Sequence, residues 1–406
     1  MLHDPTRHEA LHPRPWDAAV AQAAIAHIVH DTEARFAPGR WWPPHPRDDG
    51  PDAAAGEPRL CLYDGAAGVI WALHHLAAVG AVTLARRYDD QLDELLVRNR
   101  AALVASMPGD ERASFLLGDT PLLMMMQDAR PDAGRADLLA ALIEGNLDHP
   151  ARELLWGAPG TMLAALFLHH RFGADTRWAA LFRRCAERLW DQLEWSDVHG
   201  CHYWSQDLYG HHSTYIDAVH GFAGTAAVLL RGRELLDAPV WARWQAAITT
   251  TVTRTATRED GAANWRHSLL VDPERPPRML MQYCHGAPGF VINLLGVEGL
   301  EPLLLEAGEA VWRAGPLAKG NNLCHGTAGN GHALLKLYEG SGDARWLERA
   351  RAFAMHAIDQ LHADERAHGQ QRYSLWTGDP GLALYLWDCV RGRSAFPTLD
   401  TFFSAL

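Results

Sequence analysis

The residues of this chain with the clearest capacity for chemistry are two Cys-His pairs, Cys284-His285 and Cys324-His325. Each pair stands directly before a glycine, in the segments YCHGAPGFVINLL and LCHGTAGNGHALL. Cysteine thiolates and histidine imidazoles are the ligands that zinc prefers in proteins. Two such pairs in equivalent positions indicate a single metal site, provided that the fold brings them together.

Cys284, Cys324 and one or two of the adjacent histidines can bind one zinc ion. Two thiolates and one imidazole neutralise the ion and leave its fourth position open, as in catalytic zinc sites. A thiol bound there loses its proton more readily than a free thiol, whose pKa is about 8.5. The alternative is two buried free cysteines beside histidines that cap helices. The matched positions of the two pairs favour the metal.

His220 precedes a glycine in the same way, in AVHGFAG, but has no cysteine beside it. It can cap a helix, or it can act as the proton donor or base of a site built at this position. Because His220 shares its position with both Cys-His pairs, we expect a catalytic role.

The other candidate ligands lack this position before a glycine. Cys201 and His202 lie in an irregular stretch and are expected in a loop or in the core, with a second metal site beside His211 and His212 as the alternative. We expect the following residues to be structural: Cys61, Cys185, Cys389 and the histidine pairs at 74–75 and 169–170. The chain has no HExxH, P-loop or GxGxxG motif, so the commoner zinc-protease and nucleotide-binding interpretations lack support.

The glycine after each pair belongs to a repeat: a glycine, two residues, usually a second glycine, and then apolar residues. The first glycines of its seven copies are Gly65, Gly118, Gly157, Gly221, Gly286, Gly326 and Gly378. Their mean spacing of about 52 residues is typical of arrays of helix pairs. We call each turn that ends in one of these glycines a joint.

Two kinds of helix alternate along this repeat. Residues 177–195, RWAALFRRCAERLWDQLEW, have one apolar face and one charged face. Similar amphipathic segments lie near 15–31, 89–107, 135–149, 240–257, 300–315 and 345–361. The helix after each joint is apolar on nearly all sides and must be covered all round. The sequence therefore predicts an all-α fold, a double-layered α/α toroid (barrel) of seven inner and seven outer helices.

The joints explain how distant residues can meet. Glycine permits the tight turn into an inner helix and the close approach of neighbouring backbones. If the inner helices are parallel, the residues one and two places before each first glycine converge at one end of the ring. Helix N-termini also favour a thiolate over a thiol.

Composition sets the remaining expectations. The 406 residues are 48% hydrophobic and 21% charged, which allows a large core. We predict one domain over 1–406, with an irregular N-terminal segment 1–14. The loop 258–283 is either a substrate lid or a passive connection. A short hairpin is possible within 196–216 or 258–282.

Charge and cysteine content narrow the class of protein. A net charge of −12 without a Lys/Arg-rich run makes nucleic acid and anionic membrane surfaces poor partners. No run reaches the roughly 18 apolar residues that a membrane span needs. Six cysteines and no recognisable export signal favour a reducing compartment, so we expect a cytoplasmic protein.

The segments CHGAPG, KGNNLCHGTAGN, AVHGFAG and YSLWTGDPGLALYLWD resemble the lanthionine synthetase C-like (LanC-like) family, and the likeness covers nearly the whole chain. The resemblance implies a double-layered barrel with a catalytic zinc, Zn2+, bound by Cys284, Cys324 and His325. It also implies addition of a zinc-bound thiol to the β-carbon of a dehydroalanine or dehydrobutyrine residue, which forms a thioether. His220 matches the family's active-site histidine. His220 and His285 are the candidates for protonating the resulting enolate.

Two branches of that family differ in substrate. Peptide cyclases join a cysteine to a dehydrated residue within one precursor, whereas the eukaryotic type binds glutathione and adds it to dehydroamino acids in damaged proteins. His285 stands where cyclases often carry tyrosine, and Lys319 resembles a lysine near the bound tripeptide. Cyclases also have an arginine four residues before the first zinc cysteine, where this chain has Leu280, with Arg278 further upstream. These features favour the glutathione branch, although Lys319 can equally be a solvated loop charge. No residue is matched to the aspartate of cyclase sites.

Two other functions remain open at this point. Zinc can activate water for hydrolysis, but two thiolate ligands make the ion a weaker Lewis acid. The protein can also be a non-catalytic scaffold that binds glutathione. In each thiol-addition reading the dehydrated acceptor must be supplied ready-made, since no dehydratase domain fits in the chain.

Overall fold

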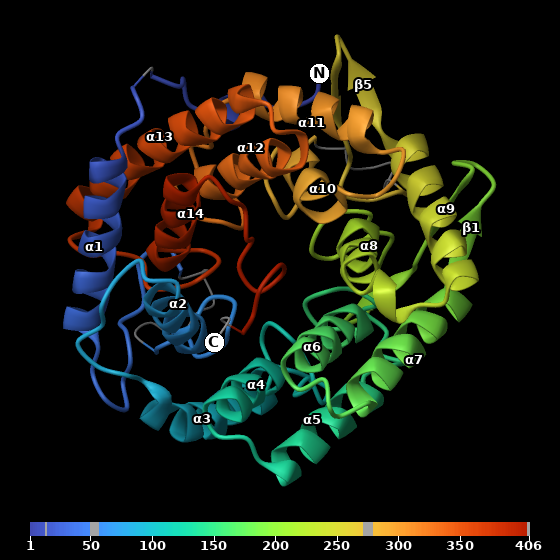
Figure 1. The fold of residues 1–406 in the computed structure, drawn as a ribbon, viewed down its shortest axis with the longest axis horizontal. Coiled ribbons are helices and arrows are strands. Elements are labelled where there is room, and N and C mark those ends of the chain that lie inside the picture. Colours follow the sequence, from blue (N-terminus) through green and yellow to red (C-terminus); the bar gives the residue numbers. More distant parts are fainter. Residues whose placement is uncertain (13, 49–56, 271–278, 404–406) are drawn as a thin grey trace.

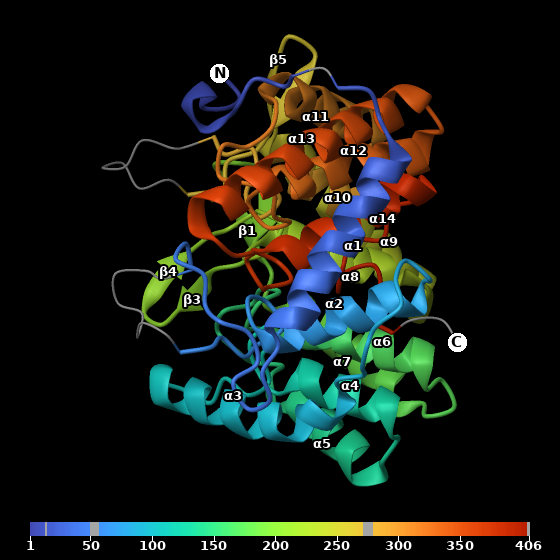
Figure 2. The same ribbon diagram turned by 90° about the vertical axis from the view of Figure 1, so that its left-hand side faces the viewer.

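The computed structural model of this chain describes residues 1–12, 14–48, 57–270 and 279–403. This part of the chain forms two concentric rings of α-helices, seen end-on in Figure 1 and from the side in Figure 2. The outer ring consists of α1 (Ala18–Arg35), α3 (Leu92–Ser106), α5 (Ala133–Gly145), α7 (Arg177–Asp191), α9 (Ala238–Thr255), α11 (Glu301–Ala314) and α13 (Ala344–His368). The inner ring consists of α2 (Ala66–Ala78), α4 (Thr120–Ala129), α6 (Ala158–Arg171), α8 (Phe222–Arg231), α10 (Ala287–Leu294), α12 (Thr327–Ser341) and α14 (Asp379–Arg391). The predicted all-α toroid is confirmed.

Burial separates the two rings as the sequence pattern requires. In the outer helix α7, one face is buried and carries Trp178, Phe182 and Cys185, while the arginines stay outside. In the inner helix α6, every residue from Ala158 to Leu168 is buried. Hydrophobic burial of this kind, rather than helix propensity, holds such helices in place.

Each inner helix begins at its joint. The first glycine is the N-cap residue of six inner helices, and in the degenerate copy the helix begins after Asp119, one residue later than Gly118. The second glycine of the repeat, three residues after the first, is required by close packing. A Cβ atom on Gly329 would lie 1.9 Å from the carbonyl oxygen of Leu323, and one on Gly289 would lie 2.1 Å from that of Tyr283. The turn before the helix folds back onto the first helical turn, and only glycine leaves room for it.

Neighbouring joints are linked by backbone hydrogen bonds. The N–H of Cys284 donates to the carbonyl of Cys324 at 3.1 Å, and the N–H of Cys324 donates to Trp376 at 2.9 Å. The chain of bonds continues from Trp376 to Tyr63 and from Tyr63 to Leu116, each at 3.0 Å. All five residues stand two places before a first glycine. The joints of five inner helices are therefore held in register along one rim of the ring.

Short hairpins supply the strands among the described residues. The pairs are β1 (Glu194–Ser196) with β2 (Cys201–Tyr203), β3 (Gln206–Leu208) with β4 (His211–Ser213), and β5 (Thr257–Glu259) with β6 (Ala262–Asn264). The tips Tyr209-Gly210 and Asp260-Gly261 have positive φ at both residues, as two-residue hairpin turns require. Hairpins thus occur in both predicted regions, and β5 begins one residue earlier than expected.

The segments before α1 and after α14 both pack against the rings of helices. The segment before α1 contains a 3₁₀ turn, Pro5–Arg7, and His8 forms a bridge to Leu317. After α14, the chain enters the barrel, where Phe396, Leu399 and Phe402 are buried. Residues 271–278 of the expected lid loop lie outside the described residues, so that role stays a prediction, as does the single domain. In the described part of the chain, no helix has the length and apolar character needed to cross a membrane.

Candidate metal centre

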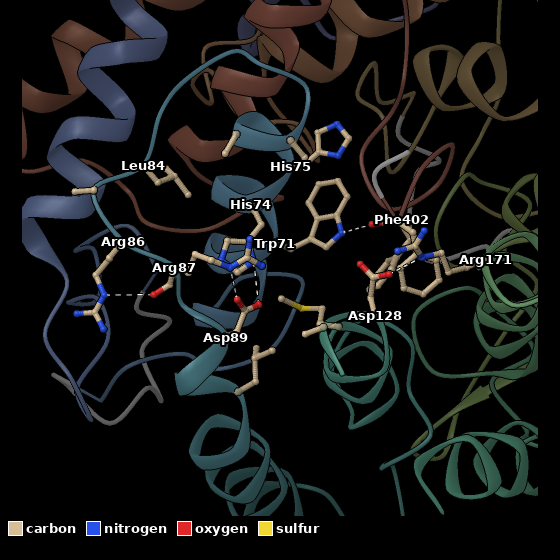
Figure 3. A pocket seen from close by; sticks show the side chains of 17 residues that line it. Trp71, His74, His75, Leu84, Arg86, Arg87, Asp89, Asp128, Arg171 and Phe402 are labelled. Atoms are coloured by element: carbon tan, nitrogen blue, oxygen red, sulfur yellow. Dashed lines mark hydrogen bonds and ion pairs between the residues drawn. The ribbon is translucent and has the colours of Figure 1, made fainter. Parts of the chain in front are cut away.

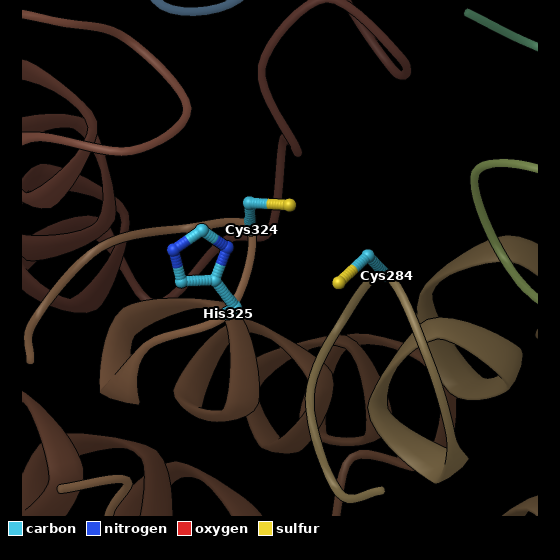
Figure 4. Close-up of side chains that lie close together, drawn as sticks. All are labelled: Cys284, Cys324 and His325. Carbon is cyan, nitrogen blue, oxygen red and sulfur yellow. The ribbon is translucent and has the colours of Figure 1, made fainter. Parts of the chain in front are cut away.

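The joints of α10 and α12 bring Cys284, Cys324 and His325 together (Figure 4). Their sulfur atoms and one imidazole nitrogen all lie within 4.8 Å of one another. The backbone bond from Cys284 to Cys324 sets this arrangement, because it places two equivalent joint positions side by side. Both cysteines are buried.

This donor set fits zinc. Zinc bonds are about 2.3 Å to sulfur and 2.0–2.1 Å to nitrogen, so tetrahedral ligands lie under about 4 Å apart. The observed separations need only a small inward movement of side chains to reach that geometry. Three ligands, two of them thiols, leave one coordination position for a substrate. Cys284, Cys324 and His325 are thus the residues that would hold Zn2+.

Further groups orient the ligands. The Tyr63 hydroxyl donates to Cys324 Sγ at 3.0 Å, and Gln282 Nε2 donates to Cys284 Sγ at 3.0 Å. The hydrogen bond from the Cys284 thiol lowers the pKa of Cys324 against the opposing effect of burial, and the Tyr63 bond adds to it. Cys324 is therefore the more readily ionised thiol. Outer contacts of this type fix ligand geometry and tune the metal.

His220 is held by a buried carboxylate. Its Nδ1 lies 3.0 Å from Oε2 of Glu153, whose side chain is fully buried. Burial alone would lower the pKa of His220, but the hydrogen bond and the negative charge of Glu153 outweigh it and raise that pKa to about 9. With Nδ1 occupied, Nε2 is the nitrogen free to exchange a proton.

His285 forms a second pair of the same kind. Its Nδ1 lies 2.6 Å from Oδ2 of the buried Asp217. Its ring centroid is 6.3 Å from that of His220, with the two rings stacked at 29°. In this arrangement His325 joins the two thiols, whereas His285 belongs with Asp217 and faces His220.

One cavity of about 450 Å3 connects these groups. It is lined by residues that stand one or two places before the first glycine in six of the seven joints: Tyr63, Asp64, Leu117, Leu155, Val219, His220, Cys284, His285, Cys324 and His325. The predicted convergence at one end of the ring is therefore what the structure shows. Arg59, Gln282 and Lys319 complete the lining, and Lys319 is exposed to solvent.

Sequence reasoning missed Tyr63, Glu153, Asp217 and Gln282. A signal existed for three of them. Glu153, Asp217 and Gln282 stand four places before a first glycine, where Asn322 stands in another joint. The side chains of Glu153, Asp217 and Asn322 accept hydrogen bonds from backbone N–H groups within their own joint. A polar residue at this position thus shapes the turn, and in Glu153 and Asp217 it also holds a histidine.

The cysteines expected to be structural are not part of the group formed by Cys284, Cys324 and His325, although the Cys61 thiol donates to Asp64 of the cavity lining at 3.0 Å. Cys185, Cys201 and Cys389 have no exposed surface, and Cys61 is buried. Among the described residues, none of the groups with metal-binding geometry includes Cys201, His202, His211 or His212. Leu280 contributes only its carbonyl, which accepts from Asn264, and Arg278 lies outside the described residues.

A second cavity of about 640 Å3 lies at the C-terminal ends of α2, α4 and α6, at the opposite end of the ring (Figure 3). His75 stacks on Trp71 there, with ring centroids 4.9 Å apart. Arg171 is paired with Asp128 and Arg87 with Asp89. The charges at this cavity are thus engaged in ion pairs of the protein itself.

Comparison with known proteins identifies the family of this chain. The lanthionine synthetase C-like protein family matches residues 57–401. The chain belongs to this family. LanC-like protein GCL1 from Arabidopsis thaliana is 29% identical over 309 residues, which is 71% of this chain and 64% of the relative. Glutathione S-transferase LANCL1 from Danio rerio is 33% identical over 129 residues, which is 30% of this chain and 32% of the relative. This LanC-like chain therefore matches less than two thirds of either relative.

Two of the solved structures that match the LanC-like chain are helical enzymes of low sequence identity. An unsaturated glucuronyl hydrolase from Bacillus sp. GL1 has a TM-score of 0.41 and 13% identity, covering 92% of this chain and 95% of that one. A polysaccharide lyase has a TM-score of 0.35 and 12% identity, covering 92% and 97%. Both scores are too low to support an inference about this chain.

Proposed function

We propose that this LanC-like protein is a zinc-dependent enzyme that adds a thiol to dehydroalanine or dehydrobutyrine residues and so forms a thioether. One observation carries the proposal: Cys284, Cys324 and His325 place their ligand atoms within 4.8 Å of one another in a cavity that also contains two carboxylate-held histidines. Zn2+ bound by these three residues would lower the pKa of a substrate thiol and hold its sulfur as a nucleophilic thiolate.

A histidine of the cavity would supply the proton that the reaction consumes. When the thiolate sulfur bonds to the β-carbon, the electrons of the double bond move toward the carbonyl and the α-carbon must then take up a proton. With a pKa of about 9, the His220 imidazole carries a proton at neutral pH, and Glu153 leaves its Nε2 free to donate. His285, whose ring lies 6.3 Å from that of His220 in the same cavity, is the second candidate for this step.

Glutathione is the thiol that the residues favour. Lys319 is a cation at the solvent-exposed edge of the cavity, suited to a carboxylate of the tripeptide. His285 stands where peptide cyclases often carry tyrosine, and one relative bears the name glutathione S-transferase. A thiol from a cysteine-containing peptide, as in lanthipeptide cyclases, is the second candidate thiol, and a scaffold that only binds glutathione is the non-enzymatic alternative.

Incubation with glutathione and a dehydroalanine-containing peptide tests the proposal. We expect a peptide adduct with the added mass of one glutathione, and its loss after metal removal by a chelator. A peptide that carries its own cysteine should be cyclised more slowly than glutathione is added. Failure of the zinc-loaded protein to form either thioether would overturn the proposal, and release of acid from ester or amide substrates would favour the hydrolase.

The His220→Ala variant separates catalysis from simple binding. Loss of the proton donor should slow adduct formation by roughly 100-fold or more, with zinc content unchanged. An unchanged rate with zinc still bound would show that His220 is not the proton donor and would leave His285 as the candidate. A rate in both proteins no higher than that without protein would favour the scaffold.

A further inference from the structure

A second group of ligand-type side chains lies on the outer surface, away from the cavity. His27 of α1 meets His362 and Glu365 of α13, where these two outer helices lie side by side (Figures 1 and 2). Their ligand atoms all lie within 4.8 Å of one another. From this geometry we propose that His27, His362 and Glu365 form a second binding site for zinc or a similar borderline divalent cation.

The carboxylate of Glu365 stands between the two imidazoles. His27 Nε2 is 2.7 Å from one of its oxygens, and His362 Nδ1 is 3.3 Å from the other. Residues three apart on a helix share a face, so α13 presents His362 and Glu365 together. Two histidines and one glutamate are a recurrent zinc ligand set that leaves one coordination position for water.

The solvent exposure of the two histidines and the hydrogen bond that holds Glu365 favour binding of a metal ion. The side chains of His27 and His362 are 46% and 45% exposed, so an ion can reach them from solvent. A neutral imidazole can carry its proton on the nitrogen turned away from Glu365 and offer its other nitrogen as a ligand. Gln371 Nε2 donates to Glu365 at 2.7 Å and holds the carboxylate in place, as supporting residues of metal sites do.

A neighbouring group of ligand-type side chains shows why we assign the metal to the His27 group. His45, Asp364 and His368 also have metal-binding spacing. However, Arg47 already pairs with Asp364 at 2.9 Å, and its backbone N–H donates to His45 Nδ1 at 3.1 Å. A neutral His45 then carries its proton on Nε2, which lies 3.9 Å from an oxygen of Asp364. The guanidinium of Arg47 thus already neutralises Asp364 in the His45 group. In the described part of the structure, the His27 group has no Lys or Arg partner.

An ion at this site would connect the first and last outer helices. Because the ring closes where α13, α14 and α1 meet, the ion would cross-link the closure. A ligand that binds only the folded state stabilises it by RT ln(1 + L/Kd), where L is the free ligand concentration, so the stabilisation grows with the logarithm of that concentration above Kd. Added Zn2+ should therefore raise the Tm of the protein with a filled Cys2His centre by roughly 2–5 °C.

Cobalt titration of the full chain distinguishes the two sites. Co2+ bound to thiolates gives an intense near-ultraviolet charge-transfer band, whereas Co2+ bound to histidine and carboxylate gives only weak visible bands. We expect two equivalents bound, one of each kind. The Cys284→Ser, Cys324→Ser double variant should still bind the equivalent without the thiolate band.

Variants on the surface decide the assignment. His27→Gln and His362→Gln should each lose the second equivalent and the Zn2+-dependent rise in Tm, while thiol addition stays unchanged. His356→Gln is the matched control, because His356 of the same helix pairs with Glu9 at 2.7 Å and belongs to none of the groups with metal-binding spacing among the described residues. Binding of a single equivalent by the wild type, or retention of the second equivalent by His27→Gln, would overturn the proposal without affecting the Cys2His centre.

Discussion

At the scale of single residues, the centre contains two imidazoles whose Nδ1 atoms are held by buried carboxylates. Glu153 holds His220 and Asp217 holds His285, and both carboxylates also accept backbone hydrogen bonds within their joints. The same side chains thus fix the turn and the orientation and charge of the histidine. Such pairing keeps an acid protonated inside a site that would otherwise favour the neutral ring.

Replacing Glu153 by glutamine should change the pH dependence of the reaction. Without the negative charge, burial dominates and the pKa of His220 falls from about 9, so the alkaline limb of the kcat/KM profile should move to lower pH by about two units or more. Glu111→Gln is the matched control, because Glu111 pairs with His149 outside the cavity lining. An unmoved limb in Glu153→Gln would contradict the role of this pair.

The same pair links folding to pH. The folded-state pKa of His220 lies above its ordinary value of 6.5, so its contribution to stability is complete below about pH 6.5 and is lost as pH rises through about 9. The difference in free energy of unfolding between wild type and Glu153→Gln should therefore shrink from pH 6.5 to 9 in urea titrations.

The hydroxyl of Tyr63 offers a test of metal tuning. Tyr63→Phe removes the hydrogen bond to Cys324 Sγ and keeps the ring that packs 5.7 Å from Trp376. We expect zinc affinity to fall about 10-fold or more, measured by competition with a chromophoric chelator, with little loss of stability. Equal affinity in the two proteins would show that this bond leaves the centre unaffected.

At the scale of elements, the joint is the unit that builds the site. The turn before each inner helix packs its backbone onto the first helical turn, and the next joint bonds to it through the residue two places before the glycine. Six of the seven turns, which share one local design, thereby contribute to the lining of one cavity, although their side chains differ. The candidate site residues therefore lie on the joints, and the glycines preserve the geometry of those turns.

Gly329→Ala should damage this unit. The added Cβ would lie 1.9 Å from the Leu323 carbonyl and 3.2 Å from Cβ of Tyr283, so the turn that carries Cys324 must move. We expect a loss of roughly 2–4 kcal/mol in the free energy of unfolding, together with weaker zinc binding.

Gly145→Ala is the matched control for this substitution. Gly145 ends α5, and a Cβ there meets no atom within 4 Å. That variant should gain roughly 0.5–1 kcal/mol, because alanine favours the helix over glycine. Similar stabilities of the two alanine variants in urea unfolding would disprove the packing argument.

At the scale of the whole molecule, the ring is filled from its far end by the C-terminal segment. Phe396 is fully buried and stacks on Tyr283 with ring centroids 4.4 Å apart, and it also contacts Trp376. Tyr283 and Trp376 belong to the joints of α10 and α14. The segment after α14 thus packs beneath the joints that carry the candidate metal centre.

Phe396→Ala tests this support. Loss of a fully buried phenylalanine should cost about 3–5 kcal/mol of unfolding free energy in urea titrations. Phe403→Ala, at a partly buried position of the same segment, should cost less. A smaller loss at Phe396 than at Phe403 would argue against a filled barrel floor.

The sequence by itself determined the local design. Apolar periodicity fixes which helices are covered on all sides, and the repeated glycines mark where those helices begin, because both depend on residues close together in the chain. From these features followed the two rings and the convergence of Cys284-His285, Cys324-His325 and His220 at one end, whereas Lys319 was expected only from the resemblance to the family.

Only the tertiary structure decided which side chains contact one another at that end of the ring. Tyr63 reaches Cys324 across 261 positions, Glu153 reaches His220 across 67, and Asp217 reaches His285 across 68. No local pattern encodes such contacts, because they depend on the order of joints around the closed ring and on the direction of each side chain. The same closure brings His27 beside His362 and Glu365, from opposite ends of the chain.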